Sequence, residues 1–391
     1  MVRPISVTLA DRLVNLPPYL FEAIDRMKRE AVASGVDLID VSIGDPDIPT
    51  PAHIVESMRA AVENPEHHRY PSSAGMLSFR RAVSGWYKTR FGVDVAPENE
   101  VVTLIGSKEG IGHLPLAFIN PGDVVLYTSP GYPVYPIGPM FAGGEGYPLP
   151  LRPENDFLPD LKSVPADILK RAKLLFFNYP NNPTAACATK SFYEDVVGFA
   201  SRHNIIACHD AAYSEIYFDG KKPMSFLEVD GAKDVGIEIH SLSKTYNMTG
   251  WRLGFAVGHK DVVGGLAKIK SNIDSGAFQA VQEAGITALG SDDSVLAPIR
   301  NTYEERRNAL ADGLRKLGLE FRMPEASFYI WAKVPAGQTS TGFVELLLRK
   351  AGIMATPGSG FGEAGEGYVR FALTVTADRM REAAARMASV I

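Results

Sequence analysis

Apolar residues recur at helical spacing in several segments of the chain. In residues 17–33 two prolines open a stretch in which leucine, isoleucine, methionine and alanine follow one another at intervals of three or four residues. This period places them on one face of a helix, with proline at its start. The same period predicts helices over 53–63, 76–92 and 298–318, and a helix, an interruption and a second helix over 260–289.

Short apolar runs alternate with these helical patterns from about residue 100 onward. The runs are 100–106, 123–130, 172–180, 205–213, 236–244 and 253–258, and an earlier one spans 36–44. Nearly continuous apolar runs are typical of parallel strands that are covered on both faces. The alternation predicts an α/β fold with a mostly parallel, mixed sheet sandwiched by helices. Toward the end of the chain, short strands at 328–334 and 368–375 flank a helix at 343–352, which predicts a smaller α+β part.

The amino-acid composition of the chain indicates which broad class of protein it belongs to. The chain has 391 residues, of which 46% are hydrophobic and 22% charged, and its net charge is −5. These values are typical of a soluble globular protein, and the absence of basic runs interleaved with aromatics gives no reason to expect nucleic acid as a partner. No apolar stretch reaches the roughly 18–20 residues of a membrane span. Two cysteines predict no disulfide framework, and the N-terminus lacks the apolar region of a signal peptide, so we expect a cytoplasmic protein.

Polar side chains follow five of the predicted strands. Ligands of parallel α/β sheets bind beyond the carboxyl ends of the strands. The residues found there are Ser107 and Lys108, Tyr132, Asn182, Asp210 with Tyr213, and Ser241, Ser243 and Lys244. Each alone has an ordinary structural explanation, such as a helix cap, loop packing or a turn. Their convergence at one sheet edge indicates a ligand site.

One ligand needs all of these groups. The start of a helix after a strand binds phosphate, and the hydroxyls of Ser241 and Ser243 with Arg252 would complete that site. A tyrosine stacks on a planar ring, a carboxylate pairs with a protonated ring nitrogen, and an asparagine binds a ring hydroxyl. A lysine amine condenses with an aldehyde. Pyridoxal 5′-phosphate carries each of these chemical groups, and its enzymes combine such a lysine with an acidic partner of the pyridine nitrogen.

The motifs themselves resemble a known family. SLSKTYNMTGWRLGFAVG (241–258) looks like the cofactor-lysine signature of the fold-type-I, pyridoxal-phosphate-dependent class I/II aminotransferases. NYPNNPT (178–184), CHDAAY (208–213), SIGDPDIPTP (42–51) and YVRFAL (368–373) are similar to further motifs of that family, in the family's order. The resemblance runs from about residue 15 to the end. It implies a homodimer, an N-terminal arm with part of a small domain in 1–45, a large cofactor domain in 46–290 and a small C-terminal domain in 291–391.

The resemblance also implies a role for each residue of the site. Lys244 would bind the cofactor covalently and then move a proton. Asp210 would pair with the pyridine nitrogen, Tyr213 and Asn182 would bind the ring oxygen, and Tyr132 would stack on the ring. Ser107, Lys108, Ser241 and Arg252 would surround the phosphate, with Tyr70 contributed by a second subunit. Arg370, helped by the Gly44 backbone, would hold the substrate α-carboxylate as a bidentate pair.

Longer stretches indicate a substrate. Segments 129–151, 154–161, 176–186 and 209–220 look most like LL-diaminopimelate aminotransferases of bacterial type, which move the amino group of L-glutamate to tetrahydrodipicolinate in lysine biosynthesis. Tyr19, Lys108 and Asn272 fall where that group's distal pocket residues would lie, Tyr19 and Asn272 across the dimer interface. A distal glutamate of the plant-like branch has no counterpart, and Ser73 is nearest. Most of these motifs are shared by broader alanine, aspartate or aromatic aminotransferases, by C–S β-lyases and by non-enzymatic regulators that bind the cofactor. These functions therefore remain as alternatives.

Three further features bear on this interpretation. The asparagine motif of the family continues with glycine, but here Ala185 follows, so that turn is expected to differ slightly. Ser241 and Lys244 match the S-x-x-K of penicillin-binding acyl transferases, but the S-D-N and K-T-G tripeptides of those enzymes do not occur and a strand precedes Ser241. Cys208 and His209 beside Asp210 suggest a metal site, yet consecutive strand residues point to opposite faces, so no metal is expected.

Overall fold

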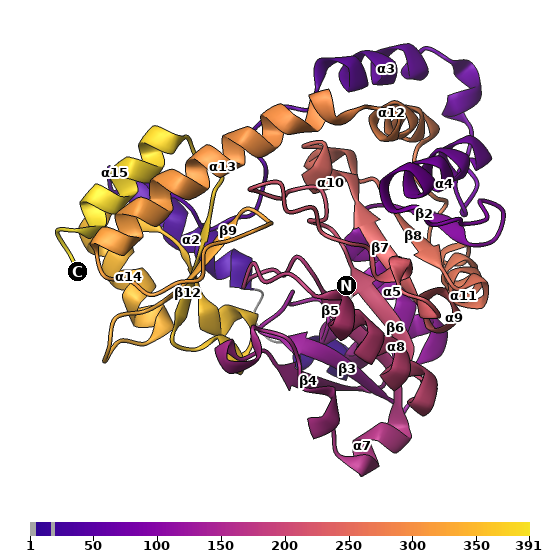
Figure 1. The fold of residues 1–391 in the computed structure, drawn as a ribbon, viewed down its shortest axis with the longest axis horizontal. Helices are drawn as coiled ribbons and strands as arrows, with labels where there is room; N and C mark the ends of the chain where they lie inside the picture. Colours follow the sequence, from indigo (N-terminus) through magenta and orange to yellow (C-terminus); the bar gives the residue numbers. More distant parts are fainter. Residues whose placement is uncertain (1–4, 17–19) are drawn as a thin grey trace.

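A seven-stranded sheet forms the centre of the molecule (Figure 1). A computed structural model describes residues 5–16 and 20–391. In spatial order the strands are β2 (Val101–Leu104), β8 (Gly254–Gly258), β7 (Gly236–Ser241), β6 (Ile206–Asp210), β5 (Ala172–Asn178), β3 (Val124–Ser129) and β4 (Glu145–Pro150). Within this sheet β8 runs in the direction opposite to the other six strands, so the prediction of a mostly parallel, mixed sheet is confirmed.

Helices cover both faces of this sheet, as the apolar runs predicted. Every residue of β2, β7 and β8 is buried. On one face the core is formed with α5 (Ser107–Phe118) and α11 (Lys260–Lys270). The opposite face packs against α4 (Leu77–Phe91), α8 (Lys190–His203) and α12 (Gln279–Leu289). The two layers leave only the strand ends and their loops available for a ligand site.

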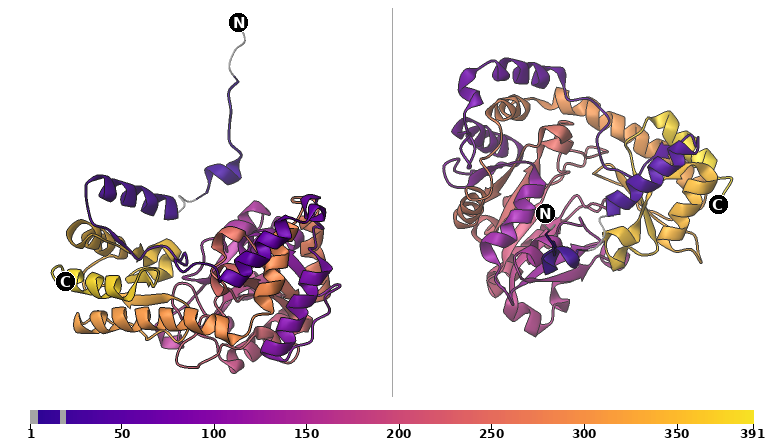
Figure 2. Two further views of the ribbon diagram at one scale, coloured as in Figure 1. Left: turned by 90° about the horizontal axis from the view of Figure 1, so that it is seen from above. Right: turned by 180° about the vertical axis from the view of Figure 1, so that it is seen from behind.

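The two ends of the chain build a second, smaller body beside the sheet (Figure 2). Its three-stranded antiparallel sheet has the order β11 (Thr356–Pro357), β12 (Tyr368–Ala372), β9 (Tyr329–Lys333). Near the other end of the chain, β1 (Ile39–Asp40) pairs with β10 (Ile353–Met354). The helices of this body are α2 (Leu20–Ala33), α13 (Asp293–Lys316), α14 (Ser340–Ala351) and α15 (Ala377–Met387).

Most predicted elements are confirmed, and two predictions are wrong in extent. Predicted strand 36–44 pairs only at Ile39–Asp40, because the chain then runs as irregular backbone toward the large sheet. The helix predicted from 298 begins at Asp293, since the Asp292 side chain caps it by accepting from the Ser294 backbone N–H at 2.8 Å, and Pro298 lies inside it. The pattern did not reveal β4 or α15.

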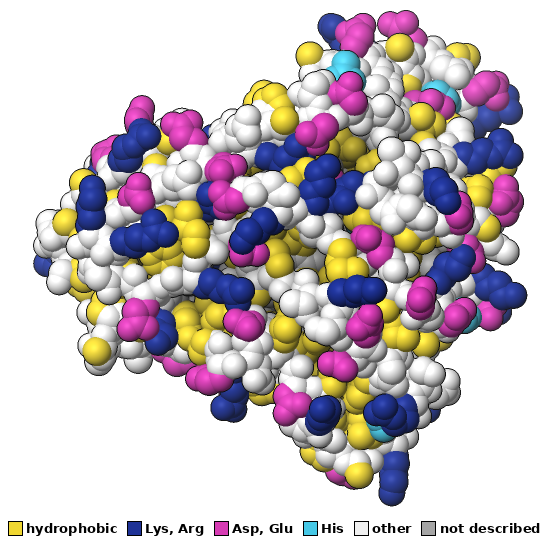
Figure 3. Space-filling model, viewed as in Figure 1, with side chains coloured by type: hydrophobic (Ala, Val, Ile, Leu, Met, Phe, Trp, Pro, Cys, Tyr) yellow, Lys and Arg dark blue, Asp and Glu magenta, His cyan; other side chains and the backbone are white. Residues whose placement is uncertain are grey.

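The surface shows no single-sign region on the face seen in Figure 3, where acidic and basic side chains are interspersed. Across residues 5–16 and 20–391, none of the helices combines the length and apolar character that crossing a bilayer requires.

Candidate functional site

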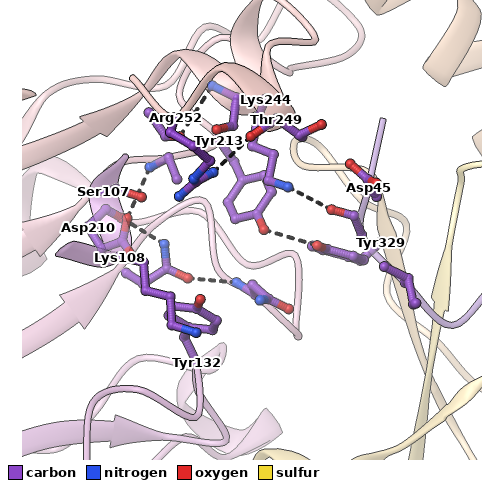
Figure 4. Close-up of a pocket in the computed structure, with 17 residues that line it drawn as sticks. Asp45, Ser107, Lys108, Tyr132, Asp210, Tyr213, Lys244, Thr249, Arg252 and Tyr329 are labelled. Atoms are coloured by element: carbon purple, nitrogen blue, oxygen red, sulfur yellow. Dashed lines mark hydrogen bonds between the residues drawn. The ribbon is translucent and has the colours of Figure 1, made fainter. Parts of the chain in front are cut away.

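A pocket of about 370 Å³ opens at the carboxyl ends of the parallel strands (Figure 4). It lies between the large sheet and the smaller body, because Tyr329 of β9 and the segment after β1 close it from the side opposite the sheet. The sequence-predicted residues among its lining are Gly44, Ser107, Lys108, Tyr132, Asn182, Asp210, Tyr213, Ser241, Ser243, Lys244 and Arg252. The structure therefore brings together groups that lie 200 residues apart in the chain.

The first turn of α5 and Arg252 form one end of the pocket. Gly106 caps α5 with a φ of 75°, and a Cβ there would lie 2.2 Å from Nη2 of Arg252. Only glycine lets the guanidinium come this close to the start of the helix. Arg252 is fixed by a 2.8 Å hydrogen bond from its Nη1 to the Thr249 backbone oxygen. The helix N-terminus and the guanidinium both attract an anion.

Asp210 ends β6 with its carboxylate buried. Oδ2 accepts a 2.8 Å hydrogen bond from the Tyr135 hydroxyl, and Oδ1 accepts from the Ala212 backbone N–H at 3.3 Å. Burial raises the pKa of Asp210, while the hydrogen bond from Tyr135 opposes that rise. A buried carboxylate with room beside it is a partner for a protonated nitrogen.

Lys244 lies in the short helix α10 (Leu242–Thr245), which directly follows β7. Its Nζ donates a 2.7 Å hydrogen bond to the backbone oxygen of Gly44. Burial is the main cause that lowers the pKa of Lys244 to about 8; Asp45 opposes this shift, and the charges of Arg370 and Arg252 contribute to it. The neutral, nucleophilic amine is therefore accessible near neutral pH.

Two hydrogen bonds between side chains also connect the pocket to the smaller body. The hydroxyls of Tyr213 and Tyr329 lie 2.9 Å apart. Nη1 of Arg370 donates to Oδ1 of Asn182 at 2.8 Å. Arg370 itself does not line the pocket but lies buried behind Asn182, where its Nη2 donates to the Ser42 backbone oxygen at 2.5 Å.

Two predicted residues lie away from this pocket, and a third cannot be placed. Tyr70 is 89% exposed and is absent from the lining of this chain's pocket. Asn272 is also exposed, and its side chain donates to the Lys268 backbone oxygen at 2.9 Å. Tyr19 falls outside the described residues. The roles given to these three require a second subunit.

The structure also shows the surroundings of Ala185, His209 and Ser241, which had suggested other interpretations. Ala185 adopts the left-handed conformation that glycine would supply, with a φ of 58°, so the turn is kept. His209 points away from Asp210 and binds Oε2 of buried Glu238 through Nδ1 at 2.8 Å. Ser241 both ends β7 and caps α10, so the expectation that a preceding strand argues against a helix start at Ser241 is wrong.

Sequence reasoning missed several lining residues. They are Ile43, Asp45, Asn178, Ala212, Thr249 and Tyr329. All except Tyr329 lie inside a motif that was recognised, and their place within that motif was the available signal. Tyr329 lies outside these motifs, because it belongs to a strand of the smaller body whose pattern indicated only apolar burial.

The donor set fits pyridoxal 5′-phosphate. Arg370 Nε is buried without a partner in the described part of the chain, beside a pocket large enough for a small molecule. An anion-binding helix start, a buried carboxylate and a lysine of lowered pKa line one cavity, which matches the phosphate, the pyridine nitrogen and the aldehyde of that group.

Comparisons with known proteins agree with this chemistry. The family model of aminotransferase class I and II matches residues 36–387. An LL-diaminopimelate aminotransferase from Syntrophobacter fumaroxidans is 58% identical over 97% of each chain, and one from Aquifex aeolicus is 57% identical over 97% of this chain and 98% of its own. Among solved structures, substrate-bound BacF from Bacillus subtilis is 38% identical with a TM-score of 0.94, covering 98% of both chains. A mutant aspartate aminotransferase from Thermus thermophilus is 30% identical with a TM-score of 0.92, covering 99% of this chain and all of its own.

Proposed function

This chain belongs to the aminotransferase class I and II family, and we propose that it transfers the amino group of L-glutamate to tetrahydrodipicolinate, which yields LL-diaminopimelate and 2-oxoglutarate. Its cofactor is pyridoxal 5′-phosphate. The observation that carries the substrate assignment is the extent of the likeness to LL-diaminopimelate aminotransferases, which exceeds half of all positions over nearly the whole chain. The pocket's donor set supports the reaction class.

Lys244 performs the proton transfer in this proposal. When bound, the cofactor supplies an aldehyde for the amino group and a ring that accepts electrons from the substrate α-carbon. The Lys244 amine would hold that aldehyde in the resting enzyme, and its lowered pKa would leave it neutral enough to act as the base at the α-carbon. The 2.7 Å hydrogen bond to the Gly44 backbone oxygen holds Nζ at the side of the pocket next to the predicted carboxylate site.

Asp210, Tyr213 and Asn182 would tune the cofactor ring. The Asp210 carboxylate keeps the ring nitrogen protonated, which increases the electron-accepting power of the ring. The hydroxyl of Tyr213 and the side-chain amide of Asn182 would bind the ring oxygen, and both groups line the pocket. Tyr132 would pack on the ring face, while Ser107, Lys108, Ser241, Ser243 and Arg252 would hold the phosphate.

Arg370 would bind the substrate α-carboxylate, since its buried guanidinium needs an anion and retains an unpartnered Nε. The second amino-acid head of LL-diaminopimelate requires polar groups at the far end of the pocket. Lys108 stands at the pocket rim, and Tyr19 and Asn272 would come from the partner subunit.

The decisive assay compares amino donors with 2-oxoglutarate as acceptor. We expect a higher kcat/KM for LL-diaminopimelate than for alanine or aspartate, and no activity for Lys244→Ala, which also loses the visible absorbance of the covalently bound cofactor. A faster reaction with alanine or aspartate would favour a broader aminotransferase. Release of pyruvate from cystathionine without amino transfer would favour a β-lyase, and neither activity would favour a regulator.

We propose a homodimer in which Tyr70 reaches the phosphate of the partner's site. Tyr70 is exposed, and its segment lies against the start of α12, since the Gln279 side chain donates to the Arg69 backbone oxygen at 3.0 Å. In residues 5–16 the side chains of Ile5 and Val7 are also exposed, and this arm stands away from the rest of the chain (Figure 2). Exposed apolar groups of this kind are covered in an assembly.

Complementation between two inactive variants tests this arrangement. A mixture of Tyr70→Ala and Lys244→Ala subunits forms hybrid dimers, and each hybrid has one site with both Tyr70 and Lys244 if Tyr70 acts across the interface. Random exchange then restores about a quarter of the unsubstituted activity, because half of the dimers are hybrids with one working site. Activity no greater than the mean of the separate variants would contradict the proposal.

The division into domains at 45 and 290 is likewise proposed. It is supported by the pairing of β1 with β10, which attaches the start of the chain to the C-terminal body. Small-angle scattering with and without a non-reactive dicarboxylate would test it, with a smaller radius of gyration expected for the complex. A cytoplasmic location stays a prediction.

A further inference from the structure

Tyr329 reaches the pocket from the smaller body. It begins β9, its side chain is buried, and its hydroxyl lies 2.9 Å from that of Tyr213 (Figure 4). The backbone of Gly44 passes so close that a Cβ at that position would lie 1.8 Å from the Tyr329 hydroxyl oxygen. The absence of a side chain at Gly44 therefore leaves the space that this hydroxyl occupies.

The same side chain also supports Arg370. The guanidinium carbon lies 4.3 Å from the centre of the Tyr329 ring, within the distance of a cation–π contact. Phe361 lies 4.7 Å from the same carbon. Tyr329 is thus in contact with both the arginine proposed to hold the substrate carboxylate and the tyrosine proposed to bind the cofactor's ring oxygen.

The hydrogen bond between the two hydroxyls has a defined direction when the cofactor is bound. Burial raises the pKa of both Tyr213 and Tyr329, so each hydroxyl keeps its single proton. If the Tyr213 hydroxyl donates its one hydrogen bond to the ring oxygen, it can only accept the hydrogen bond that it shares with Tyr329. A hydroxyl that accepts a hydrogen bond becomes a stronger donor, because bonds in a chain polarise one another.

The charged groups around this pair are few. Arg370 faces Tyr329 from β12 and Asp45 faces it from the segment after β1, with opposite effects on the tyrosine pKa. Asp210 acts on Tyr213 from β6, and Lys244 lies 5.8 Å from the ring centre of neighbouring Phe328. An anion bound at Arg370 would change the field at the Tyr329 hydroxyl first.

We propose that Tyr329 is a positioning residue that couples occupancy of the carboxylate site at Arg370 to the hydrogen bond between Tyr213 and the cofactor's ring oxygen. This coupling would act in addition to the hydrogen bond between Arg370 and Asn182, and it would not pass through that bond. The inference rests on the cofactor roles proposed above for Tyr213 and Arg370, and it does not depend on which amino acid is the substrate.

Spectrophotometric pH titration of the cofactor-loaded enzyme tests the proposal. Stabilising the ring oxygen as an anion holds down the pKa of the visible chromophore that Lys244 forms with the cofactor. Tyr329→Phe weakens that stabilisation, so the chromophore pKa rises by roughly half to one pH unit, the size of one neutral hydrogen bond. The change in chromophore pKa on adding succinate, a dicarboxylate that cannot react, becomes smaller than in the unsubstituted enzyme.

Tyr303→Phe is the matched control. The Tyr303 hydroxyl is buried without a partner among the described residues, and its ring stacks on Phe328 at 5.2 Å, in the same layer as Tyr329. Its removal should leave the chromophore pKa unchanged. In a Tyr213→Phe background, Tyr329→Phe should also have no further effect, whereas a purely structural role would add to the first substitution.

An unchanged chromophore pKa in a folded Tyr329→Phe enzyme would overturn the inference alone. A rise of equal size in the Tyr213→Phe background would do the same, since it would show an effect that does not pass through Tyr213. Absence of any chromophore in the unsubstituted protein would refute the proposed cofactor site and this inference with it.

Discussion

Arg370 on β12 donates a 2.8 Å hydrogen bond from Nη1 to Oδ1 of Asn182, a residue 188 positions earlier in the chain. The bond joins the smaller body to the loop after β5. It also fixes the plane of a guanidinium that stands almost fully buried, with its Nε unpartnered in the described structure. A buried cation in this state has a strong preference for an anion.

Replacing Arg370 by lysine should therefore impair substrate binding more than folding. Lysine keeps the charge but cannot make the two parallel hydrogen bonds of a guanidinium. We expect kcat/KM for amino-acid donors to fall about 100-fold, the equivalent of roughly 2–3 kcal/mol for a charged hydrogen bond. Arg307→Lys is the control, because Arg307 makes a comparable pair with Asp219 outside the pocket lining. Equal losses in both variants would contradict a specific role for Arg370.

The lowered pKa of Lys244 predicts how cofactor-free enzyme captures pyridoxal phosphate. Burial disfavours the charged ammonium and brings its pKa from 10.5 to about 8. Only the neutral amine attacks an aldehyde, so the capture rate should rise with pH and level off above about 8. Stopped-flow absorbance measures this rate. A midpoint near 10 would show that the amine is not desolvated.

The sequence predicted the ligand site better than it predicted the contacts that complete it. Lys244, Asp210 and Asn182 follow apolar strands directly, and parallel topology alone places such strand ends side by side. Tyr329 and the Tyr135–Asp210 hydrogen bond depend on how separate elements pack, and no local pattern encodes that. The same holds for β1, whose apolar run was long enough for a full strand but finds only β10 as a partner.

Tyr135 should influence catalysis through Asp210. Its hydroxyl stabilises the charged carboxylate by a 2.8 Å hydrogen bond, so Tyr135→Phe raises the pKa of Asp210 further above its ordinary value. The ionised form is the one that pairs with a protonated ring nitrogen. We expect kcat/KM to fall about 10-fold or more, as for loss of a hydrogen bond to a charged group, and the acid limb of its pH profile to move to higher pH.

Tyr246→Phe serves as the comparison for that experiment, because the Tyr246 hydroxyl is buried and has no partner in the described chain. It should change neither kcat/KM nor the acid limb. If the acid limb of the kcat/KM profile is also unchanged in Tyr135→Phe, ionisation of Asp210 does not control that limb.

A buried ion pair beneath the start of α5 should dominate the response to acid in that region. The Lys270 side chain is fully buried and pairs with Glu109 and with Asp274, the latter at 3.3 Å. Burial alone would raise the pKa of Glu109, but His113 and Lys270 outweigh it and lower that pKa to about 2. The pair's stabilisation is present above the ordinary glutamate pKa of 4.5 and is lost as the pH falls toward 2.

Lys270→Met should therefore lower the free energy of unfolding by roughly 3–5 kcal/mol at neutral pH, because it leaves the largely buried Glu109 carboxylate without its lysine partner. Glu109 also accepts from the Ile105 backbone N–H at 2.5 Å, next to the proposed phosphate turn, so cofactor affinity should weaken as well. Adding Glu109→Gln should recover part of the lost stability. Denaturant unfolding of the single and double variants measures this, and a double variant less stable than Lys270→Met would contradict it.

Ala185 offers a substitution that should stabilise the protein. It is buried with a φ of 58°, and its backbone N–H donates to the Asn181 oxygen at 2.9 Å, so the left-handed conformation is required by the turn. That conformation costs an alanine about 1–2 kcal/mol. Glycine removes the strain but loses roughly 0.5–1 kcal/mol through its freer unfolded state, which leaves a net gain of about 0–1.5 kcal/mol.

Thermal unfolding should show Ala185→Gly melting about 1 °C above the unsubstituted protein, as about 1 kcal/mol gives in a chain of this size. Ala186→Gly is the neighbouring control: Ala186 is equally buried but has no positive φ, so glycine there only adds unfolded-state freedom and should lower the melting temperature. Because Asn182 lies in the same turn, kcat/KM should stay unchanged in Ala185→Gly if the alanine already holds the turn in the geometry that glycine would give. A lower melting temperature for Ala185→Gly than for Ala186→Gly would show that the left-handed conformation carries no strain.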